Sequence, residues 1–270
     1  MDSEIIIHSN ALPIGGIGID PGKREEILTN DEAAIALARS LVAYYEHIKG
    51  RKYWMVKHGM KFLVDIDEPD TGIKEIMGDY ILAGEYELNT TRLFERIIKP
   101  EHVCVDVGAS IGYFTILMGK LGKEVYAIEP IKEQCDRIVK NVTGNSLSNV
   151  EVINKALSSK QGVIKINGMA HGRDSAEAIT LDSLNIQQVD IMKMDIDGSE
   201  PEALKGATET IKRSPNLQLV IEYYPEYIKK LGNNPKEMID FLSNHFTHVK
   251  RIGGDLNDKC FNYYCYNHEN

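Results

Sequence analysis

The stretch that most constrains the fold of this chain covers residues 103–130. It begins with a short run of β-branched residues, turns at the glycine-containing segment 108–112 and continues into an apolar helical pattern over 113–121. A second apolar run, 124–128, then ends at the acid Glu129. A strand, glycine turn, helix and strand in this order form a unit that binds nucleoside cofactors. Its glycines let the backbone approach a ligand, and its helix N-terminus offers free N–H donors.

The spacing within this unit favours S-adenosylmethionine over a dinucleotide. The dinucleotide fingerprint Gly-x-Gly-x-x-Gly needs a middle glycine that makes room for a pyrophosphate, and Ser110 takes that position here. Asp106 places a carboxylate beside the turn, which repels a phosphate and suits an ammonium group. Glu129 offers two oxygens to the two ribose hydroxyls. A nicotinamide-dependent oxidoreductase is the alternative that this spacing disfavours.

Several ordered motifs extend the pattern beyond the first unit. They are DVGASIGY at 106–113, AIEP at 127–130, NKAL at 154–157, TLD at 180–182 and KMDIDGSE at 193–200. Over roughly residues 80–225 the chain thereby resembles the FkbM family of class I S-adenosylmethionine-dependent methyltransferases. Several motifs in order are far more specific than one glycine loop.

We therefore expect an α/β fold with a doubly wound, Rossmann-like methyltransferase sheet. The sheet should be mostly parallel with an antiparallel last strand, and an N-terminal helix and hairpin should extend it. Residues 1–28 are interpreted as a flexible arm, with a substrate lid or dimer-exchange segment as the alternative. Residues 29–98 are predicted to form a helix and hairpin layer over the cofactor cleft. Residues 99–270 are predicted to form the S-adenosylmethionine-binding domain.

The resemblance also indicates which residues contact the cofactor. It places the segment that carries Glu85 over the methionine end, where a solvated helix-end carboxylate is the alternative interpretation. It assigns the turn that begins at Asn154 to the adenine. The complete set of expected cofactor-binding residues is Glu85, Asp106, Gly108, Ala109, Ser110, Gly112, Tyr113, Glu129, Pro130, Asn154, Ala156 and Asp195.

Candidate catalytic residues follow two later strands. Lys193 interrupts an apolar strand two residues before Asp195, so both side chains share a face and the lysine needs a partner or an aqueous cleft. Glu222 ends the next strand, where its carboxylate converges with that of Asp195. We hypothesise that Asp195 takes a proton from the methyl acceptor directly. The alternatives are that Asp195 and Glu222 bind a divalent cation such as Mg²⁺, or that Lys193 and Asp195 form only a structural ion pair.

Composition and the fourth-strand turn narrow the acceptor. The formal net charge is −9 and no basic cluster is present, so nucleic acid is not expected as a partner. Base N-methylation usually employs an Asn/Asp-Pro-Pro-aromatic turn, whereas this chain has DIDG at 195–198. We thus expect O-methylation, and the resemblance points to a hydroxyl on a sugar, glycan, glycolipid or related small molecule. A catalytically silent S-adenosylmethionine-binding partner protein is the alternative.

Localisation and assembly are less constrained by the sequence. No run approaches the ~20 apolar residues of a transmembrane helix, and the start at Met1 lacks the basic residues of a signal peptide. The four cysteines form no CxxC pair, which fits a reducing compartment. We therefore expect a cytoplasmic protein, for which a homodimer is left open.

Overall fold

The computed structural model describes most of the chain from residue 86 onwards and three short segments before it. The described residues are 6–8, 52–57, 59–65, 86–166, 175–253 and 259–268. Contacts divide the chain into two compact units, Met1–Tyr86 and Glu87–Asn270. Two features expected from the sequence lie outside the described residues, namely Glu85 and the helix that would begin near Thr29. The proposed layer over the cofactor cleft stays a prediction.

The first unit contains a small three-stranded sheet in the order β1-β2-β3. Strands β2 (Lys52–Lys57) and β3 (Met60–Asp65) pair antiparallel, which confirms the predicted hairpin. Gly59 between them has a φ of 73°, a left-handed conformation that glycine adopts without steric cost. Strand β1 (Ile6–His8) pairs parallel with β2, so part of the expected arm forms regular structure.

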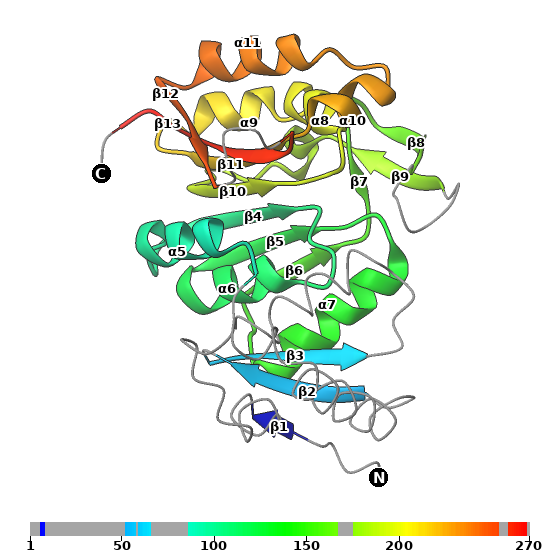
Figure 1. Ribbon diagram of the computed structural model, residues 1–270, viewed down its shortest axis with the longest axis vertical. Coiled ribbons are helices and arrows are strands. Elements are labelled where there is room, and N and C mark those ends of the chain that lie inside the picture. Colours follow the sequence, from blue (N-terminus) through cyan, green and yellow to red (C-terminus); the bar gives the residue numbers. More distant parts are fainter. Residues whose placement is uncertain are drawn as a thin grey trace, which may run out of the picture. The chain divides into compact units, whose positions relative to one another are not determined.

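The second unit is built on a seven-stranded sheet in the order β12-β13-β11-β10-β4-β5-β6 (Figure 1). Five strands run parallel, while β13 is antiparallel to both of its neighbours. This arrangement confirms the predicted doubly wound sheet with a terminal antiparallel pair. The strands are β4 (Val103–Val107), β5 (Glu124–Ile128), β6 (Val150–Ile153), β10 (Ile191–Met194), β11 (Gln218–Tyr223), β12 (His248–Ile252) and β13 (Phe261–Tyr266).

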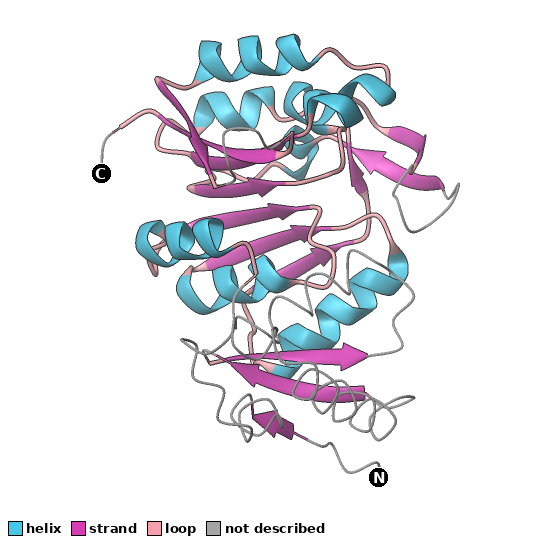
Figure 2. Ribbon diagram, in the orientation of Figure 1, coloured by secondary structure: helices cyan, strands magenta, loops and turns pink. Residues whose placement is uncertain are grey.

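Helices cover both faces of this sheet, as Figures 1 and 2 show. One face carries α5 (Leu88–Ile97), α6 (Tyr113–Leu121) and α7 (Lys132–Gly144). The other carries α8 (Glu200–Lys205), α9 (Thr208–Arg213), α10 (Pro225–Lys230) and α11 (Pro235–His245). Within the described parts of the chain, none of these helices has the length and apolarity that a membrane crossing requires.

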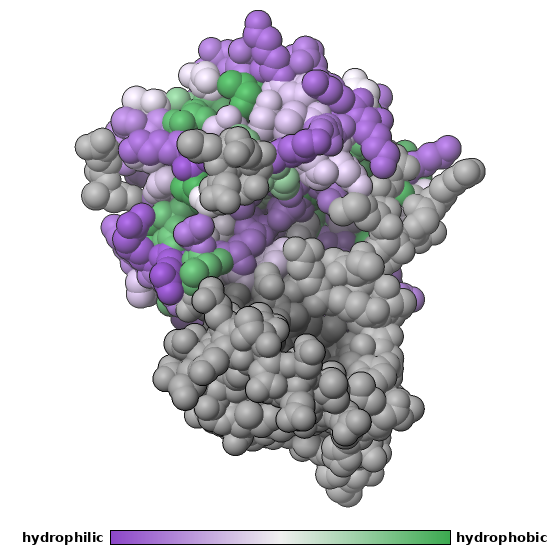
Figure 3. All heavy atoms as spheres, in the orientation of Figure 1, coloured by the Kyte–Doolittle hydropathy of each residue, from purple (hydrophilic) through white to green (hydrophobic). Residues whose placement is uncertain are grey.

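Alternating residues of the central strands build the core on the α8–α11 face. They pack against apolar side chains of those helices, because successive residues of a strand point to opposite faces. The buried strand residues in this cluster include Val105, Val107, Met192, Met194, Leu219 and Ile221, and the helix residues include Leu204, Ile228 and Leu242. On the face drawn in Figure 3, hydrophilic residues cover most of the described part and hydrophobic residues form only small patches.

Two details differ from the expected elements. Strands β7 (Ala156–Leu157), β8 (Gly162–Lys165) and β9 (Ser175–Ile179) form a separate small sheet. The single helix expected over 201–212 is divided into α8 and α9 at Gly206. A Cβ atom on Gly206 would lie 2.0 Å from the carbonyl oxygen of Ser158, so only glycine permits this close backbone approach.

The contact of Gly206 predicts a large cost for a small substitution. Gly206→Ala forces the Ser158 backbone to move, and we expect the free energy of unfolding in urea to fall by about 2–3 kcal/mol. Gly119→Ala is the matched control within α6, where the new Cβ would meet the flexible end of Leu147 at 2.9 Å. For Gly119→Ala the free energy of unfolding should fall by less than about 1 kcal/mol, because alanine has a higher helix propensity than glycine. Equal losses in both variants would contradict the close approach at Gly206.

Candidate functional site

Strand register brings the candidate residues to one face and one edge of the sheet. Lys193 on β10 lies opposite Asp106 on β4 and opposite Val220 on β11. Paired residues of neighbouring strands share a face, so Lys193 and Asp106 lie side by side on the face that α5 and α6 cover. Glu222, two residues after Val220, extends the same row towards the carboxyl edge.

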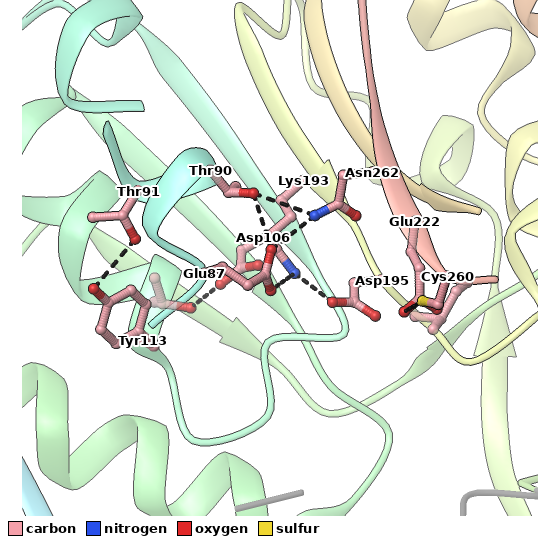
Figure 4. Close-up of polar contacts among 12 residues, drawn as sticks. Glu87, Thr90, Thr91, Asp106, Tyr113, Lys193, Asp195, Glu222, Cys260 and Asn262 are labelled. Atoms are coloured by element: carbon pink, nitrogen blue, oxygen red, sulfur yellow. Dashed lines mark hydrogen bonds and ion pairs between the residues drawn. The ribbon is translucent and has the colours of Figure 1, made fainter. Parts of the chain in front are cut away.

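The ammonium group of Lys193 is the centre of this row (Figure 4). The residue is 3% exposed, and its Nζ lies 2.6 Å from Asp195 Oδ2 and 3.4 Å from Glu87 Oε1. It also lies 4.7 Å from the centroid of the Phe114 ring, a cation–π geometry. A lysine inside a buried strand needs a partner, and Asp195 is that partner in the structure. The ion pair explains how the strand tolerates the charge of Lys193.

Asp106 is buried beside this lysine. It is 1% exposed, and its Oδ2 accepts a hydrogen bond of 2.6 Å from Thr115 Oγ1 on α6. Burial raises the pKa of Asp106, while the charge of Lys193 and the Thr115 hydrogen bond oppose the rise. The ammonium group of Lys193 thus lies next to Asp106, the carboxylate that the sequence analysis expected to contact the ammonium group of the cofactor.

Glu87 is a member of the site that the sequence analysis missed. It precedes α5 with a left-handed φ of 44°, and its Oε2 accepts hydrogen bonds from Asn262 Nδ2 at 2.8 Å and Thr90 Oγ1 at 3.0 Å. Its other oxygen faces Lys193, and 19% of its side chain is exposed. The available signal was Thr90 three residues later, since a hydroxyl at that spacing reaches an acid at a helix start.

The glycine turn packs against the same group of residues. Gly108, Ser110 and Gly112 all have positive φ values, of 80°, 51° and 89°. A Cβ atom on Gly108 would lie 1.8 Å from the carbonyl oxygen of Asp195, so this glycine is needed for the turn to contact the end of β10. Tyr113 then begins α6, and its buried hydroxyl accepts a hydrogen bond of 3.2 Å from Thr91. Ala109 within the turn is buried.

Glu129 ties the turn to the loop after β5. It is 4% exposed, and its two oxygens accept hydrogen bonds of 2.9 Å from the N–H groups of Ser110 and Ile131. Burial raises its pKa to about 7, although both backbone hydrogen bonds oppose the rise. Two loops therefore fix the position of this carboxylate.

Asn154 joins the next two loops of the same edge. Its Nδ2 donates to the carbonyl oxygens of Glu129 at 3.0 Å and Pro130 at 2.9 Å. Ala156 follows in β7 and is 5% exposed. The expected ribose and adenine residues therefore lie on connected loops, while Glu85 lies outside the described residues.

Two further carboxyl groups at this edge each retain a buried oxygen without a hydrogen-bond partner in the described residues. Glu200 is fully buried, and its Oε1 accepts from the N–H of Ile196 at 2.8 Å while its Oε2 is unpartnered. Glu222 Oε1 accepts from Cys260 Sγ at 3.1 Å, and its Oε2 is likewise unpartnered. Burial is the main cause that raises the pKa of Glu200 to about 8 and that of Glu222 to about 9, and nearby Asp195 adds to both. Both groups therefore hold a proton at neutral pH.

The described residues contain no group of three or more His, Cys, Asp or Glu side chains arranged to hold a metal ion. Asp195 and Glu222 therefore gain no third ligand from this part of the chain. Asp195 has the Lys193 ammonium as its partner, and 26% of its side chain is exposed. The arrangement places the partly exposed side chain of Asp195 beside two buried carboxyl groups with raised pKa values.

A family model and several solved structures are similar to this chain. The model described as the methyltransferase FkbM domain matches residues 106–247. An FkbM methyltransferase from Methylobacillus flagellatus KT shares 19% identity at a TM-score of 0.47, over 71% of this chain and 53% of its own. The chain thus spans about half the length of that protein. No curated protein sequence matches significantly.

Two other structures illustrate the range of similar proteins. TYW2 from M. jannaschii, in complex with AdoMet, shares 18% identity over 79% of this chain and 83% of its own, at a TM-score of 0.44. An rRNA methylase from Streptococcus thermophilus shares 13% identity over 67% of this chain and 95% of its own, at a TM-score of 0.45. All three TM-scores are below 0.5, so these likenesses leave the acceptor open.

The buried carboxyl of Glu200 predicts a specific pH dependence of stability. Its pKa rises from 4.5 to about 8 on folding, so between these values the unfolded state has released a proton that the folded state retains. The free energy of unfolding should therefore fall as the pH rises through this window, by roughly 3–5 kcal/mol from this group. Glu200→Gln cannot ionise, and urea unfolding at pH 5, 6.5 and 8 should show a smaller decline than in the wild type.

Glu202→Gln is the matched control for this prediction. The hydrogen bond to Lys205 is the main cause that lowers the pKa of Glu202, so this group titrates below the window. Its variant should follow the decline of the wild type. An unchanged decline in Glu200→Gln would show that Glu200 does not retain its proton in the folded state.

Proposed function

This chain belongs to the FkbM family of S-adenosylmethionine-dependent methyltransferases, and from that premise we propose an O-methylation reaction. The acceptor in this proposal is a hydroxyl on a sugar, glycan, glycolipid or related small molecule. The observation that carries it is the group of three carboxyl side chains, Glu87, Asp106 and Asp195, around the ammonium of Lys193. Membership in the family supports methyl transfer, whereas the acceptor and the roles of individual residues are proposed here.

The local charge supports S-adenosylmethionine as the methyl donor. Three carboxyl groups meet one ammonium, so the site favours a ligand with excess positive charge and disfavours a phosphate. Asp106 is nearly inaccessible and already faces Lys193, whereas Glu87 and Asp195 are partly exposed. We therefore assign the methionine ammonium of the cofactor to Glu87 and Asp195, with Asp106 acting through Lys193.

The remaining cofactor contacts follow the loops of the carboxyl edge. Glu129 accepts hydrogen bonds from the ribose, because two backbone N–H groups fix its carboxylate at this edge and a carboxylate presents two oxygens to two neighbouring hydroxyls. The turn at 108–112 contributes backbone groups near Tyr113. The loops that Asn154 connects, including Pro130 and Ala156, form the adenine side.

Proton removal is the task of the protein in this reaction. When bound, S-adenosylmethionine supplies an electrophilic methyl carbon and leaves as the neutral thioether. An aliphatic hydroxyl is a weak nucleophile at neutral pH, so a base must take its proton as the new carbon–oxygen bond forms. We assign this role to Asp195, which is the partly exposed carboxylate held in place by Lys193.

The direct route is preferred over a metal-assisted one. A divalent ion such as Mg²⁺ prefers several oxygen ligands that are ionised or carbonyl groups. The described residues give Asp195 and Glu222 no third acidic, histidine or cysteine ligand for such an ion. A catalytically silent S-adenosylmethionine-binding protein is the second candidate, because membership in an enzyme family does not by itself show that a chain is active.

The first test concerns the ribose contact. Glu129→Ala removes the acceptor for two buried hydroxyls, and we expect calorimetry with S-adenosylhomocysteine to show a loss of about 1.5–3 kcal/mol, more than tenfold in Kd. Glu129→Gln keeps one acceptor oxygen, so its affinity should lie between that of the wild type and that of Glu129→Ala. Asp136→Ala on the exposed surface of α7 is the control. Unchanged affinity in a folded Glu129→Ala protein would refute the assignment.

The second test concerns the base. Asp195→Asn should lower methyl transfer by about 10²-fold or more, because the amide cannot take the proton. The assay follows tritium from the labelled methyl group into an extract of glycans and glycolipids, with melting temperatures as the check on folding. Asp136→Asn serves as the control, and a chelator should leave the wild-type rate unchanged.

Each alternative has its own outcome in this assay. Near wild-type transfer by a folded Asp195→Asn protein would refute its role as the base. Inhibition by the chelator would favour the metal-assisted route. Binding of S-adenosylhomocysteine without any transfer by the wild type would favour the silent binding protein.

A further inference from the structure

The carboxylate of Glu87 is held by two side chains that are far apart in the sequence. Its Oε2 accepts hydrogen bonds from Asn262 Nδ2 on β13 at 2.8 Å and from Thr90 Oγ1 in the first turn of α5 at 3.0 Å. Its Oε1 lies 3.4 Å from Lys193 Nζ. One oxygen therefore fixes the side chain, and the other faces the centre of the site (Figure 4).

The three polar groups form a closed set of hydrogen bonds. A carboxylate only accepts, so the Asn262 side chain turns its NH₂ group towards Glu87. Thr90 donates its hydroxyl proton to Glu87, and its oxygen accepts a second hydrogen bond from Asn262 Nδ2 at 3.2 Å. Thr90 is 2% exposed, which keeps water from replacing its hydroxyl in this set. The orientation of the Glu87 carboxylate is thus fixed by two side chains.

The backbone of Glu87 also indicates that its position matters. The residue has φ 44° and ψ 61°, a left-handed conformation that is uncommon for a residue with a side chain. Residues in such conformations persist where surrounding contacts hold them, and they cluster at functional sites. In the described part of the chain the Glu87 carboxylate does not cap α5, which it precedes. Its contacts therefore serve the site and not the helix end.

The hairpin of β12 and β13 reaches the start of α5 at two points. Asn262 lies opposite Glu222 of β11, which places its side chain on the face of the sheet that carries Lys193. A Cβ atom on Gly253, directly after β12, would lie 3.3 Å from Asn89 Nδ2 in the first turn of α5. The hairpin and the first turn of α5 are therefore packed together at this edge of the sheet.

These contacts come from both flanks of the segment that the family model matches. That segment covers residues 106–247, so Glu87 lies before it and Asn262 lies after it. Lys193 and its ion-pair partner Asp195 lie within it, and the flanks reach them through Glu87. The fixation of Glu87 is therefore a property of the flanking segments of this chain, which the family match does not describe.

We propose that Thr90 and Asn262 are positioning residues for the amino-acid part of the cofactor. By fixing one oxygen of Glu87, they hold its carboxylate beside Lys193, where it receives the methionine ammonium group. A contact that is fixed before the ligand arrives loses less conformational freedom on binding. This inference rests on the proposed function and adds the side chains that set the affinity for one part of the cofactor. The adenosine part contacts other loops and does not depend on them.

The test compares two ligands that share the adenosine part. S-adenosylhomocysteine carries the amino-acid part, whereas 5′-methylthioadenosine lacks it. Calorimetry measures the first ligand and ligand-observed NMR titration the second, both on the full chain. We expect Asn262→Ala and Thr90→Val each to weaken S-adenosylhomocysteine by about fivefold or more, and 5′-methylthioadenosine by less than about twofold. A general disturbance of the structure would weaken both ligands alike.

Further variants show whether the two residues act through Glu87. Thr90→Ser keeps the hydroxyl and should bind S-adenosylhomocysteine within about twofold of the wild type. In a Glu87→Ala protein, the added change Asn262→Ala should cause no further loss, because its effect needs the carboxylate. Asn267→Ala is the matched control and should leave both ligands unchanged. Asn267 Oδ1 accepts a hydrogen bond of 2.8 Å from the Thr247 N–H at the opposite end of the same hairpin.

Several results would overturn the inference. They are unchanged affinity for S-adenosylhomocysteine in the folded variants, an equal loss of both ligands, a further loss from Asn262→Ala in the Glu87→Ala protein, and no binding of 5′-methylthioadenosine to the wild type. Melting temperatures check folding, and Thr90→Val decides the matter where Asn262→Ala does not fold. If the wild type binds S-adenosylhomocysteine and one of these results is found, the positioning roles alone are wrong. If the wild type does not bind it, the proposed function fails together with them.

Discussion

The buried ammonium group of Lys193 is the constraint on which the rest of the site depends. Removing an ion from water costs several kcal/mol unless it is paired, and a strand interior between two helical layers offers no water. The required partners come from the start of α5 with Glu87, from β4 with Asp106 and from the end of β10 with Asp195, while α6 contributes the ring of Phe114. One charge therefore fixes the relative positions of four elements at the carboxyl edge of the sheet.

The environments of the acids then divide them into different roles. Asp195 has a cationic partner and partial exposure, whereas Glu200 and Glu222 are buried without one, and their pKa values rise to about 8 and about 9. Groups of the same chemical type that are separated in this way can serve as base and as neutral hydrogen-bond donors in one site. Burial is the main cause of the two raised values, and Asp195 differs from Glu200 and Glu222 in its partial exposure and in its ion pair with Lys193.

The parts of the fold and site that depend on local sequence patterns could be predicted from the sequence. The parts that depend on contacts between distant residues could not. The strand, turn and helix at 103–121 follow from periodicity, and the family resemblance implied the antiparallel pair at the end. The position of Lys193 in an apolar strand indicated that it needs a partner or an aqueous cleft, and the structure supplies Asp195 as the partner. The sequence analysis missed Glu87, because only the start of α5 decides that this acid faces the sheet, while Glu85 lies outside the described residues and stays a prediction. The bond from Asn262 to Glu87 spans 175 residues, and no local pattern contains it.

The hydrogen bonds at the carboxyl edge of the sheet differ between Glu129 and the two buried acids Glu200 and Glu222. Both oxygens of Glu129 accept backbone N–H groups from two different loops, so that acid is held in position before any ligand arrives, as a preorganised cofactor contact requires. In the described part of the chain Glu222 and Glu200 each have one buried oxygen without a hydrogen-bond partner, which is uncommon in a folded protein. The chain itself therefore holds the carboxylate that we propose as the ribose contact. Glu200 and Glu222 both lie close enough to Asp195 for its charge to raise their pKa values, so the unpartnered oxygens of these two acids lie near the residue that we propose as the base.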